Sequence, residues 1–346
     1  VSPETKGKIM NKDYNYIIVG AGSAGCAVAN RLSENPNNKV LLIEAGRSSH
    51  PVSRLPASFA LLIDNPKANW RYRSEPEENT SNRQIPIPRG KLLGGSSSIN
   101  GLVYVRGNKL DYDTWAQMGN TGWSYDDVLP FFKKIENYQG EITELRSSEG
   151  PLKISEVVDR NPIYEGLFKG ASEIGIPTNK DYNGDEQEGI SYTQTTIFKG
   201  ERMSAEVAYL KPIRSRKNLT IITNSLVTKL LFDGKTCIGV KVKNKNKINE
   251  FFAQNEVILC GGAINSPQVL ELSGIGNRSI LEEKGISLVH ELKGVGENLR
   301  DHLGPRLVYN ITKRGISYND KARGINLIKQ VLTYAFKREG FLTLPS

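Results

Sequence analysis

The chain has few of the residues that build disulfide frameworks, Cys/His metal centres or membrane spans. Its 346 residues include three cysteines and three histidines, and no two cysteines have the C-x-x-C spacing typical of metal or redox sites. No run of about eighteen apolar residues occurs, so the sequence predicts no membrane span. An odd number of cysteines leaves at least one unpaired. We therefore expect an ordinary globular protein without a bound metal.

Positive charge is in excess but is not concentrated. Lys and Arg number 46 against 37 Asp and Glu, which gives a net charge of +9. The densest basic stretch, residues 241–247, lies between two strand-like runs and has no interleaved aromatic residues. Such a stretch indicates a solvated hairpin tip rather than a nucleic-acid surface. The length of the chain predicts two domains.

The stretch from Tyr14 to Gly46 carries the strongest local pattern. An apolar run over 16–19 has the length and β-branched content of a buried parallel strand. A GxGxxG spacing follows, then a helical pattern of small residues, then a second apolar strand over 40–43 that ends in Glu44. This order of strand, glycines, helix, strand and acid is typical of dinucleotide-binding units.

Each of these residues has a physical reason in such a site. Gly20 permits the tight turn, Gly22 lets a pyrophosphate approach the backbone, and Gly25 lets the helix pack closely on the sheet. The free N–H groups at the start of the helix then face the phosphates. Glu44 is placed to accept the ribose hydroxyls, which disfavours a 2′-phosphate. The stretch therefore predicts a dinucleotide with free ribose hydroxyls.

Two later stretches are also rich in glycine. Residues 90–113 read GKLLGGSSSINGLVYVRGNKLDYD, in which Gly94 and Gly95 allow close backbone approach and serines follow as helix N-caps. A Gly–Ser linker is the alternative interpretation, but linkers are not followed directly by INGLVYVRG. A third pair, Gly261 and Gly262, follows a predicted strand and opens a predicted helix.

These stretches resemble the signatures of one enzyme family. Residues 90–113 resemble the first signature of the glucose–methanol–choline (GMC) flavin oxidoreductases, residues 261–276 resemble the second, and the opening stretch resembles their FAD fingerprint. The resemblance runs over about residues 14–343. It implies an FAD-dependent oxidoreductase that acts on the CH–OH group of an alcohol or sugar, with hydride transfer to flavin N5. Oxygen or a quinone would reoxidise the flavin.

The resemblance also implies which residues contact FAD. Asn100, Gly101 and Val103 match positions that line the flavin. Some family members attach FAD through a histidine just before the position of Asn100. That position here is Ile99, and no histidine lies nearby, so we expect non-covalent FAD.

Other expected contacts involve the backbone and the ADP half of the cofactor. Val227 matches a position whose backbone meets adenine, and Asp301 lies in a further stretch that resembles a family segment near the flavin. The complete set of expected cofactor-binding residues is Gly20, Gly22, Ser23, Gly25, Glu44, Ala45, Arg89, Gly94, Gly95, Asn100, Gly101, Val103, Val227, Gly261 and Asp301.

The expected fold is α/β. A Rossmann-like FAD-binding domain, with a parallel sheet, helices and a smaller antiparallel sheet, is expected from residues 14–150 and 218–304. Residues 151–217 are expected to belong to an α+β substrate domain, and residues 305–346 to begin its incomplete remainder. Short β-branched runs within 219–260 predict strands.

Three local expectations concern helices and cysteines. Apolar periodicity predicts a helix within 115–136, which Pro130 interrupts or kinks. Arg202 and Ser204 are interpreted as caps of a helix over 204–210. Two of the cysteines lie in apolar strand or helix contexts and are interpreted as small core residues.

The chain shows no catalytic pair. In the family a histidine, partnered by a second histidine or an asparagine, acts as the base. His50 and His290 lie in contexts unlike that motif, and His302 is interpreted as a structural or cofactor-side residue. We therefore expect the catalytic residues C-terminal to Ser346, and the chain to be a fragment that does not oxidise alcohols by itself.

Two alternatives stay open. An NAD-dependent dehydrogenase would use the same opening stretch but would leave the later glycine-rich stretches unexplained. A non-catalytic flavin-binding protein is the second, because no catalytic histidine is found. The expected partners are a small alcohol or sugar and an electron acceptor, with no nucleic acid. Four N-x-S/T sequons support secretion only slightly, and the sequence does not predict the substrate or the oligomeric state.

Overall fold

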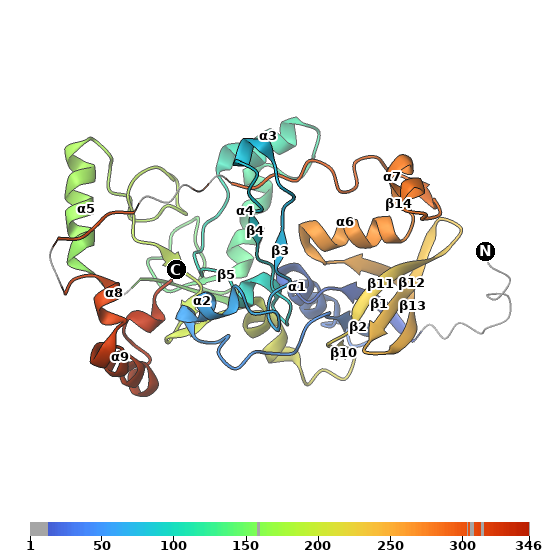
Figure 1. Ribbon diagram of the computed structural model, residues 1–346, viewed down its shortest axis with the longest axis horizontal. Coiled ribbons are helices and arrows are strands. Elements are labelled where there is room, and N and C mark those ends of the chain that lie inside the picture. Colours follow the sequence, from blue (N-terminus) through green and yellow to red (C-terminus); the bar gives the residue numbers. More distant parts are fainter. Residues whose placement is uncertain (1–12, 158–159, 303, 305–307, 313–314, 346) are drawn as a thin grey trace. The chain divides into compact units, whose positions relative to one another are not determined.

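The protein is described from a computed structural model of the chain (Figure 1). The structure describes residues 13–157, 160–302, 304, 308–312 and 315–345. The chain forms two compact units. The first comprises Val1–Pro51, Leu61–Ile99 and Ser204–Arg306, and the second comprises Val52–Ala60, Asn100–Met203 and Leu307–Ser346. The domain boundaries expected from the sequence stay a prediction, because these units are defined by contacts within the structure.

A six-stranded sheet forms the centre of the first unit (Figure 1). Its order is β10-β2-β1-β13-β12-β11, in which the first four strands are parallel and the last three are joined as antiparallel neighbours. This confirms an α/β fold with a mainly parallel sheet and a smaller antiparallel extension. The strands are β1 (Tyr14–Val19), β2 (Val40–Ile43), β10 (Leu219–Ile222), β11 (Leu226–Asp233), β12 (Thr236–Asn244) and β13 (Lys247–Leu259).

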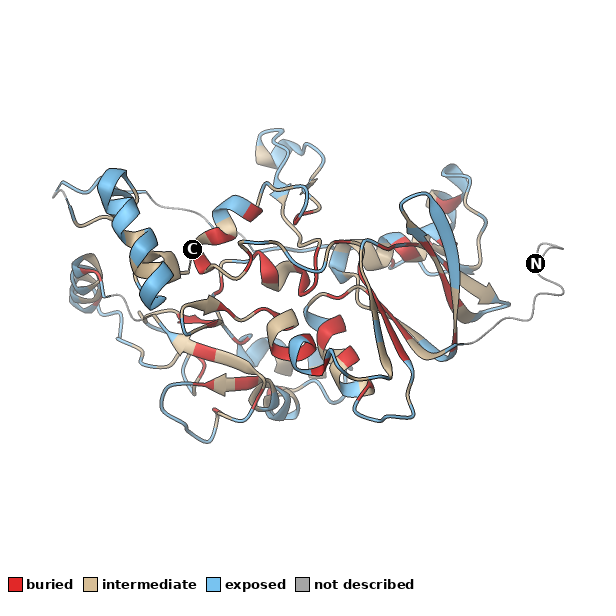
Figure 2. Ribbon diagram, turned by 90° about the horizontal axis from the view of Figure 1, so that it is seen from below, coloured by how far each residue is buried: buried red, intermediate tan, exposed pale blue. Residues whose placement is uncertain are grey.

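The apolar residues of the neighbouring parallel strands β1 and β2 are buried on both faces of the sheet. Ile17 and Ile18 of β1 and Leu41 and Leu42 of β2 are fully buried. Figure 2 colours the buried parts of the chain red. Their unbroken apolar runs are the pattern that predicted parallel strands. The core continues through β12 and into helix α6, which contributes Val269.

Helices of the first unit follow the strands in the order expected for a βαβ crossover. Helix α1 (Ser23–Leu32) connects β1 to β2, and α6 (Gly262–Leu272) follows β13 and packs against β11. The helix expected over 204–210 is a short π-helical turn, η5 (Glu206–Leu210), that contacts α1. The remaining short elements are β3 (Tyr72–Arg73), η3 (Glu78–Thr80), β4 (Pro86–Ile87), η4 (Gly95–Ser98), η6 (Lys211–Ile213), β14 (Ile275–Gly276), α7 (Arg278–Glu283) and β15 (His290–Glu291), and α2 (Phe59–Leu62) lies where the chain passes between units.

The second unit is α+β. Its largest sheet has three strands in the order β5-β6-β7. Its elements are η2 (Pro56–Ser58), α3 (Lys109–Gln117), α4 (Tyr125–Ile135), β5 (Glu136–Tyr138), β6 (Leu152–Glu156), α5 (Pro162–Glu173), β7 (Gln194–Thr195), β8 (Ile197–Phe198), β9 (Glu201–Arg202), α8 (Tyr318–Lys321), α9 (Gly324–Lys337) and η7 (Phe341–Thr343). Within the described residues of both units, no helix is long and apolar enough to span a bilayer.

The expected interruption at Pro130 is wrong, since α4 continues through this residue, and the expected kink stays a prediction. A proline removes one backbone N–H donor from the helix. At the start of α4, Ser124 and Asp127 form a capping box that satisfies two otherwise free N–H groups. We attribute the survival of the helix to this anchoring of its first turn.

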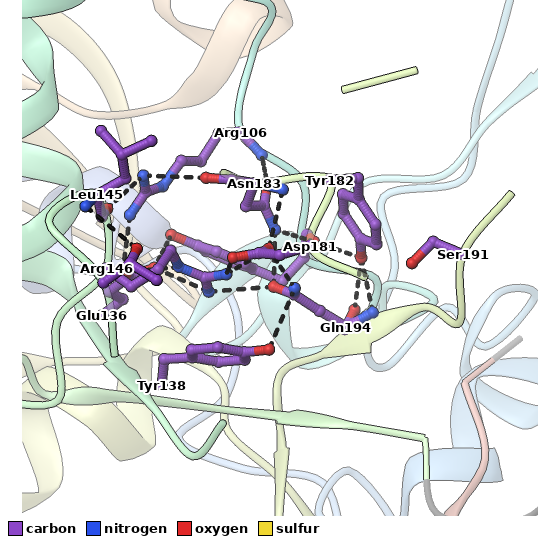
Figure 3. A network of polar contacts seen from close by, with 12 residues as sticks. Arg106, Glu136, Tyr138, Leu145, Arg146, Asp181, Tyr182, Asn183, Ser191 and Gln194 are labelled. Atoms are coloured by element: carbon purple, nitrogen blue, oxygen red, sulfur yellow. Dashed lines mark hydrogen bonds and ion pairs between the residues drawn. The ribbon is translucent and has the colours of Figure 1, made fainter. Parts of the chain in front are cut away.

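A buried polar network holds the strands and loops of the second unit together (Figure 3). The Arg146 guanidinium donates to Glu136 at 3.1 Å, to Asp181 at 2.6 Å and to Gln194 at 3.1 Å. Arg106 adds a second cation, with its Nη2 2.7 Å from Glu136 Oε1. The side chains of Arg146 and Glu136 are fully buried. Two cations thus balance two carboxylates inside this unit.

Candidate cofactor-binding site

A cavity of about 570 Å³ lies in the first unit at the carboxyl ends of its parallel strands. Val19, Ile43 and Leu259, the last residues of β1, β2 and β13, all line it. The carboxyl ends of parallel strands are where open α/β sheets bind their ligands. The chain's fold alone therefore marks this cavity as the candidate site.

The three glycines of the first motif have different surroundings. Gly20 has φ of +97°, a conformation that residues with a side chain rarely adopt. A Cβ on Gly25 would overlap the carbonyl oxygen of Gly20, so α1 packs here as closely as its backbone permits. A Cβ on Gly22 would meet no protein atom within 4 Å, although Gly22 lines the cavity. The open side of Gly22 is therefore available to a ligand.

The second glycine pair packs directly on the first motif. Gly94 N donates to Ala21 O at 2.8 Å, and a Cβ on Gly95 would lie 2.7 Å from Gly22 Cα. Gly95 and Ser96 line the cavity, whereas Gly94 does not. The two motifs, although far apart in the sequence, form one continuous backbone surface.

Two helices begin at the cavity. Ser23 and Ala24 of α1 and the first residues of α6, from Gly262 to Ser266, line it. The N-terminus of a helix carries free N–H donors and the positive end of its dipole, so it binds anions. Arg89 also lines the cavity and adds a full positive charge. The arrangement fits a doubly charged pyrophosphate.

Glu44 is the buried acid of the site. Its side chain is 6% exposed, and its two carboxylate oxygens accept from Ala21 N at 2.9 Å and Gly46 N at 2.8 Å. Burial raises the pKa of Glu44, although these two hydrogen bonds and the charge of Lys91 oppose the increase. Each carboxylate oxygen has capacity for a further hydrogen bond. The ionised group can therefore accept two vicinal hydroxyls.

An aromatic cluster forms part of the wall and was not expected from the sequence. Trp70 lines the cavity and stacks on Tyr72, with 5.8 Å between ring centroids. Lys91 Nζ lies 4.3 Å from the Trp70 ring centroid, and Asn265 Nδ2 donates to the Tyr72 hydroxyl at 2.7 Å. By itself, the sequence of residues 70–72 is typical of a short strand and does not indicate a cavity wall. No pattern in the sequence relates Tyr72 to Asn265, which lies 193 positions further along the chain.

The structure brings most of the expected cofactor residues of the first unit together. Three of the expected residues do not line the cavity. Gly25 is buried, Gly94 contacts the first motif through its hydrogen bond to Ala21 O, and Asp301 is exposed. The expected residues that do line it are Gly20, Gly22, Ser23, Glu44, Ala45, Arg89, Gly95, Val227 and Gly261. Contact of each of these residues with a cofactor stays a prediction.

Asn100, Gly101 and Val103 belong to the second unit, and their expected place at the flavin also stays a prediction. Arg202 donates to Asn100 at 2.7 Å and is 1% exposed, so its interpretation as a helix cap is wrong. The isolated sequence pattern resembled a cap because a serine and an acid follow it. Ser204 is placed as expected, since its Oγ accepts from Val207 N at 3.4 Å.

The cysteines differ from one another in their surroundings. Cys26 is fully buried and confirms the expectation of a core residue, and burial raises the pKa of its thiol to about 12. Cys260 is partly buried and lines the cavity, so it is not a simple core residue.

Comparison with known proteins identifies similar chains. A sequence profile described as GMC oxidoreductase matches residues 14–304. The chain is 41% identical over 337 residues to an alcohol dehydrogenase (acceptor) of Pseudomonas putida, a match that covers 95% of this chain and 60% of that protein. It is 43% identical over 298 residues to an oxygen-dependent choline dehydrogenase of Photobacterium profundum, covering 85% of this chain and 52% of that protein.

A solved structure is also similar. An FAD-dependent oxidoreductase from Chaetomium thermophilum superimposes with a TM-score of 0.88 at 30% identity, covering 96% of this chain and 60% of that one. The chain thus spans 52 to 60% of the length of these proteins.

Proposed function

Because the chain belongs to the GMC oxidoreductase family, we propose that it is the FAD-binding part of an oxidoreductase that acts on the CH–OH group of an alcohol. FAD is the cofactor of this family. The cavity at the strand ends, lined by two helix N-termini and a buried carboxylate, is the observation that supports the proposal most directly.

The residues present fit the ADP half of FAD. The open side of Gly22 and the first turns of α1 and α6 would take the pyrophosphate, with Arg89 as a counter-charge. Glu44 would accept the ribose hydroxyls through its two oxygens. A 2′-phosphate would place negative charge against this carboxylate, which disfavours an NADP-type ligand.

When bound, FAD supplies the oxidising group, which takes a hydride from the carbon that carries the hydroxyl. This chain's own residues bind the cofactor, orient it and exclude water from its phosphates. We assign no base to the described residues. Asn65 Nδ2 donates to His50 Nε2 at 3.3 Å, and His290 is exposed on β15. Neither histidine lines the cavity.

We propose that the base and most of the substrate pocket lie outside these 346 residues, because the relatives that match the chain are much longer. Their names suggest small alcohols, choline among them, as the substrate class, and oxygen or another acceptor as the oxidant. The transcript beyond the codon for Ser346 tests this point. A reading frame that continues into a segment with a histidine supports it, and an immediate stop codon contradicts it.

The cofactor assignment is tested on the purified chain. After incubation with FAD and removal of free ligand, the protein should be yellow and should release FAD on denaturation. It should show no comparable binding of NADH. A colourless protein that binds NADH reversibly would contradict the proposal and would support an NAD-dependent dehydrogenase.

A further inference from the structure

The antiparallel strands of the first unit carry an excess of positive charge. β11, β12 and β13 form the antiparallel side of the six-stranded sheet (Figure 1). Residues 226–250 contain six lysines but only two acids. Val240 and Val242 of β12 are buried in the core. Because side chains alternate along a strand, Lys241 and Lys243 lie on the opposite face of the sheet.

The register of the strands brings further side chains onto this opposite face. Directly opposed residues share one face of an antiparallel sheet. One row across the three strands is Lys229, Lys241 and Glu250, and Lys243 is opposed to Ile248 in the next row. We call these five residues the lysine face. Lys241 is partly exposed and the other four are exposed, so three cations and an aliphatic side chain meet solvent together.

Two of the lysines occupy positions that the fold does not favour. Lys229 is directly opposite Lys241, and like charges opposed across two strands destabilise a sheet. The charged atoms of Lys241 and Glu250 are 4.0 Å apart at exposed positions, so this pair relieves little of the repulsion. Lys245, in the turn between β12 and β13, has φ of +50°, a conformation that favours Gly or Asn. Stability of the hairpin therefore does not account for these lysines.

Protection of a sheet edge accounts for one lysine only. β11 is an edge strand, and a lysine on an edge strand opposes pairing with other chains. Lys243 lies on β12, an inner strand, opposite Ile248, which is 62% exposed. A cation beside an exposed aliphatic side chain fits a surface that is anionic outside and apolar beneath. Nucleic acids present phosphate and sugar to such a face and would leave Ile248 without an apolar partner.

We propose that the lysine face and Lys245 bind the surface of a membrane that contains anionic phospholipids. The ammonium groups contact lipid phosphates, and Ile248 enters the boundary between headgroups and acyl chains. Binding of this kind holds the protein at the surface and needs no spanning helix. The inference is independent of the proposed function, since none of these residues lines the cavity at the strand ends.

The test is co-sedimentation of the 346-residue chain with phospholipid vesicles. The wild type should bind vesicles of mixed phosphatidylserine and phosphatidylcholine, and should not bind vesicles of phosphatidylcholine alone. Binding should weaken as salt is added, because salt screens exposed charges. The triple variant Lys229→Gln/Lys243→Gln/Lys245→Gln should bind roughly 100-fold more weakly, since each lysine near an anionic membrane contributes about a 5-fold change.

Two further variants separate a membrane from other anionic partners and from net charge. Ile248→Thr keeps a β-branched residue and should weaken vesicle binding roughly 3- to 5-fold, without changing binding to heparin, a soluble polyanion. The matched control has the same net charge as the triple variant and replaces three exposed lysines of the first unit outside these strands: Lys217→Gln, Lys284→Gln and Lys293→Gln. It should bind vesicles within about 3-fold of the wild type.

Several results would overturn the proposal. They are no binding to phosphatidylserine vesicles, an equal loss of binding in the control, or unchanged vesicle binding in Ile248→Thr. Duplex DNA bound through the same lysines, without vesicle binding, would indicate a nucleic-acid surface instead. Urea unfolding tests whether the lysines serve the fold. The triple variant should unfold at the same or a higher urea concentration than the wild type, because repulsion of Lys241 is removed. A lower midpoint would show that the lysines stabilise the sheet and would also overturn the proposal.

Discussion

Two glycines of the same motif, Gly22 and Gly25, should respond in opposite ways to the same substitution. In Gly22→Ala the new methyl group meets no protein atom within 4 Å and projects toward the cavity that Gly22 lines. In Gly25→Ala it overlaps the carbonyl oxygen of Gly20, a backbone atom that moves only if α1 separates from β1. The first substitution should therefore affect the ligand, and the second should affect the fold.

The magnitudes follow from these surroundings. Gly22 has φ of −78° and ψ of −161°, which alanine adopts without strain. Reduced freedom of the unfolded chain stabilises such a substitution by about 0.4–1 kcal/mol. Alanine is a poorer N-cap than glycine by a similar amount, so the net change in unfolding free energy should lie within about 0.5 kcal/mol of zero. Overpacking at Gly25 should cost about 1–3 kcal/mol or more.

FAD affinity, in contrast to stability, should be lowered by the substitution at Gly22. A methyl group at Gly22 would keep the phosphates from the first N–H groups of α1. Loss of one such bond to a charged group costs about 1.5–3 kcal/mol, which is roughly a 10- to 100-fold weaker affinity.

The assay is urea unfolding of the cofactor-free chain, together with FAD titration of each variant. We expect Gly22→Ala to unfold with the wild type and bind FAD poorly, and Gly25→Ala to unfold at lower urea. Wild-type FAD affinity in Gly22→Ala, or equal destabilisation by both substitutions, would refute this account of the motif.

Three further predictions concern single side chains. Glu44→Gln should destabilise the cofactor-free chain by about 1–3 kcal/mol, since one of two buried backbone N–H groups loses its acceptor. Burial raises the pKa of Glu44, so the folded chain holds this proton more tightly than the unfolded chain. The wild type should therefore be more stable at pH values below the raised pKa, and this stability should be lost as the pH rises through it. Unfolding curves at several pH values should lack this dependence in Glu44→Gln. FAD should quench tryptophan emission less in Trp70→Phe than in Trp123→Phe, since only Trp70 of these two lines the cavity; equal quenching would contradict the wall assignment. Arg146→Met should cost about 3–5 kcal/mol in urea unfolding, because Asp181 loses its guanidinium partner inside the network, and a change below about 1 kcal/mol would contradict the importance of that network.

The sequence predicted the parts of the site that are local in the chain. From β1 to β2, each step depends on neighbours close in the sequence, so the spacing of Gly20, Gly22 and Gly25 and the position of Glu44 could be interpreted directly. The strand β13 was expected to be short but runs from Lys247 to Leu259, and it forms a hairpin with β12. The basic stretch 241–247 reaches this hairpin tip only at Lys245 and Asn246, since residues 241–244 belong to β12.

The sequence did not predict contacts that depend on distant pairing. Trp70 reaches the cavity through a cluster with Asn265, and Arg202 reaches Asn100 across 102 positions. Both residues lie in short irregular segments whose local patterns indicate only a strand or a helix cap. Long-range pairing of polar side chains leaves no periodicity, so local reasoning misinterpreted Arg202 and missed the role of Trp70.

The most direct test of the central claim is equilibrium titration of the cofactor-free 346-residue chain with FAD, in the presence and absence of ADP. The account predicts saturable binding of one FAD per chain, competition by ADP, and an FAD affinity that is roughly 10- to 100-fold weaker in Gly22→Ala. Absence of FAD binding by a folded chain, or binding that neither ADP nor Gly22→Ala weakens, would contradict the assignment of the cavity at the strand ends.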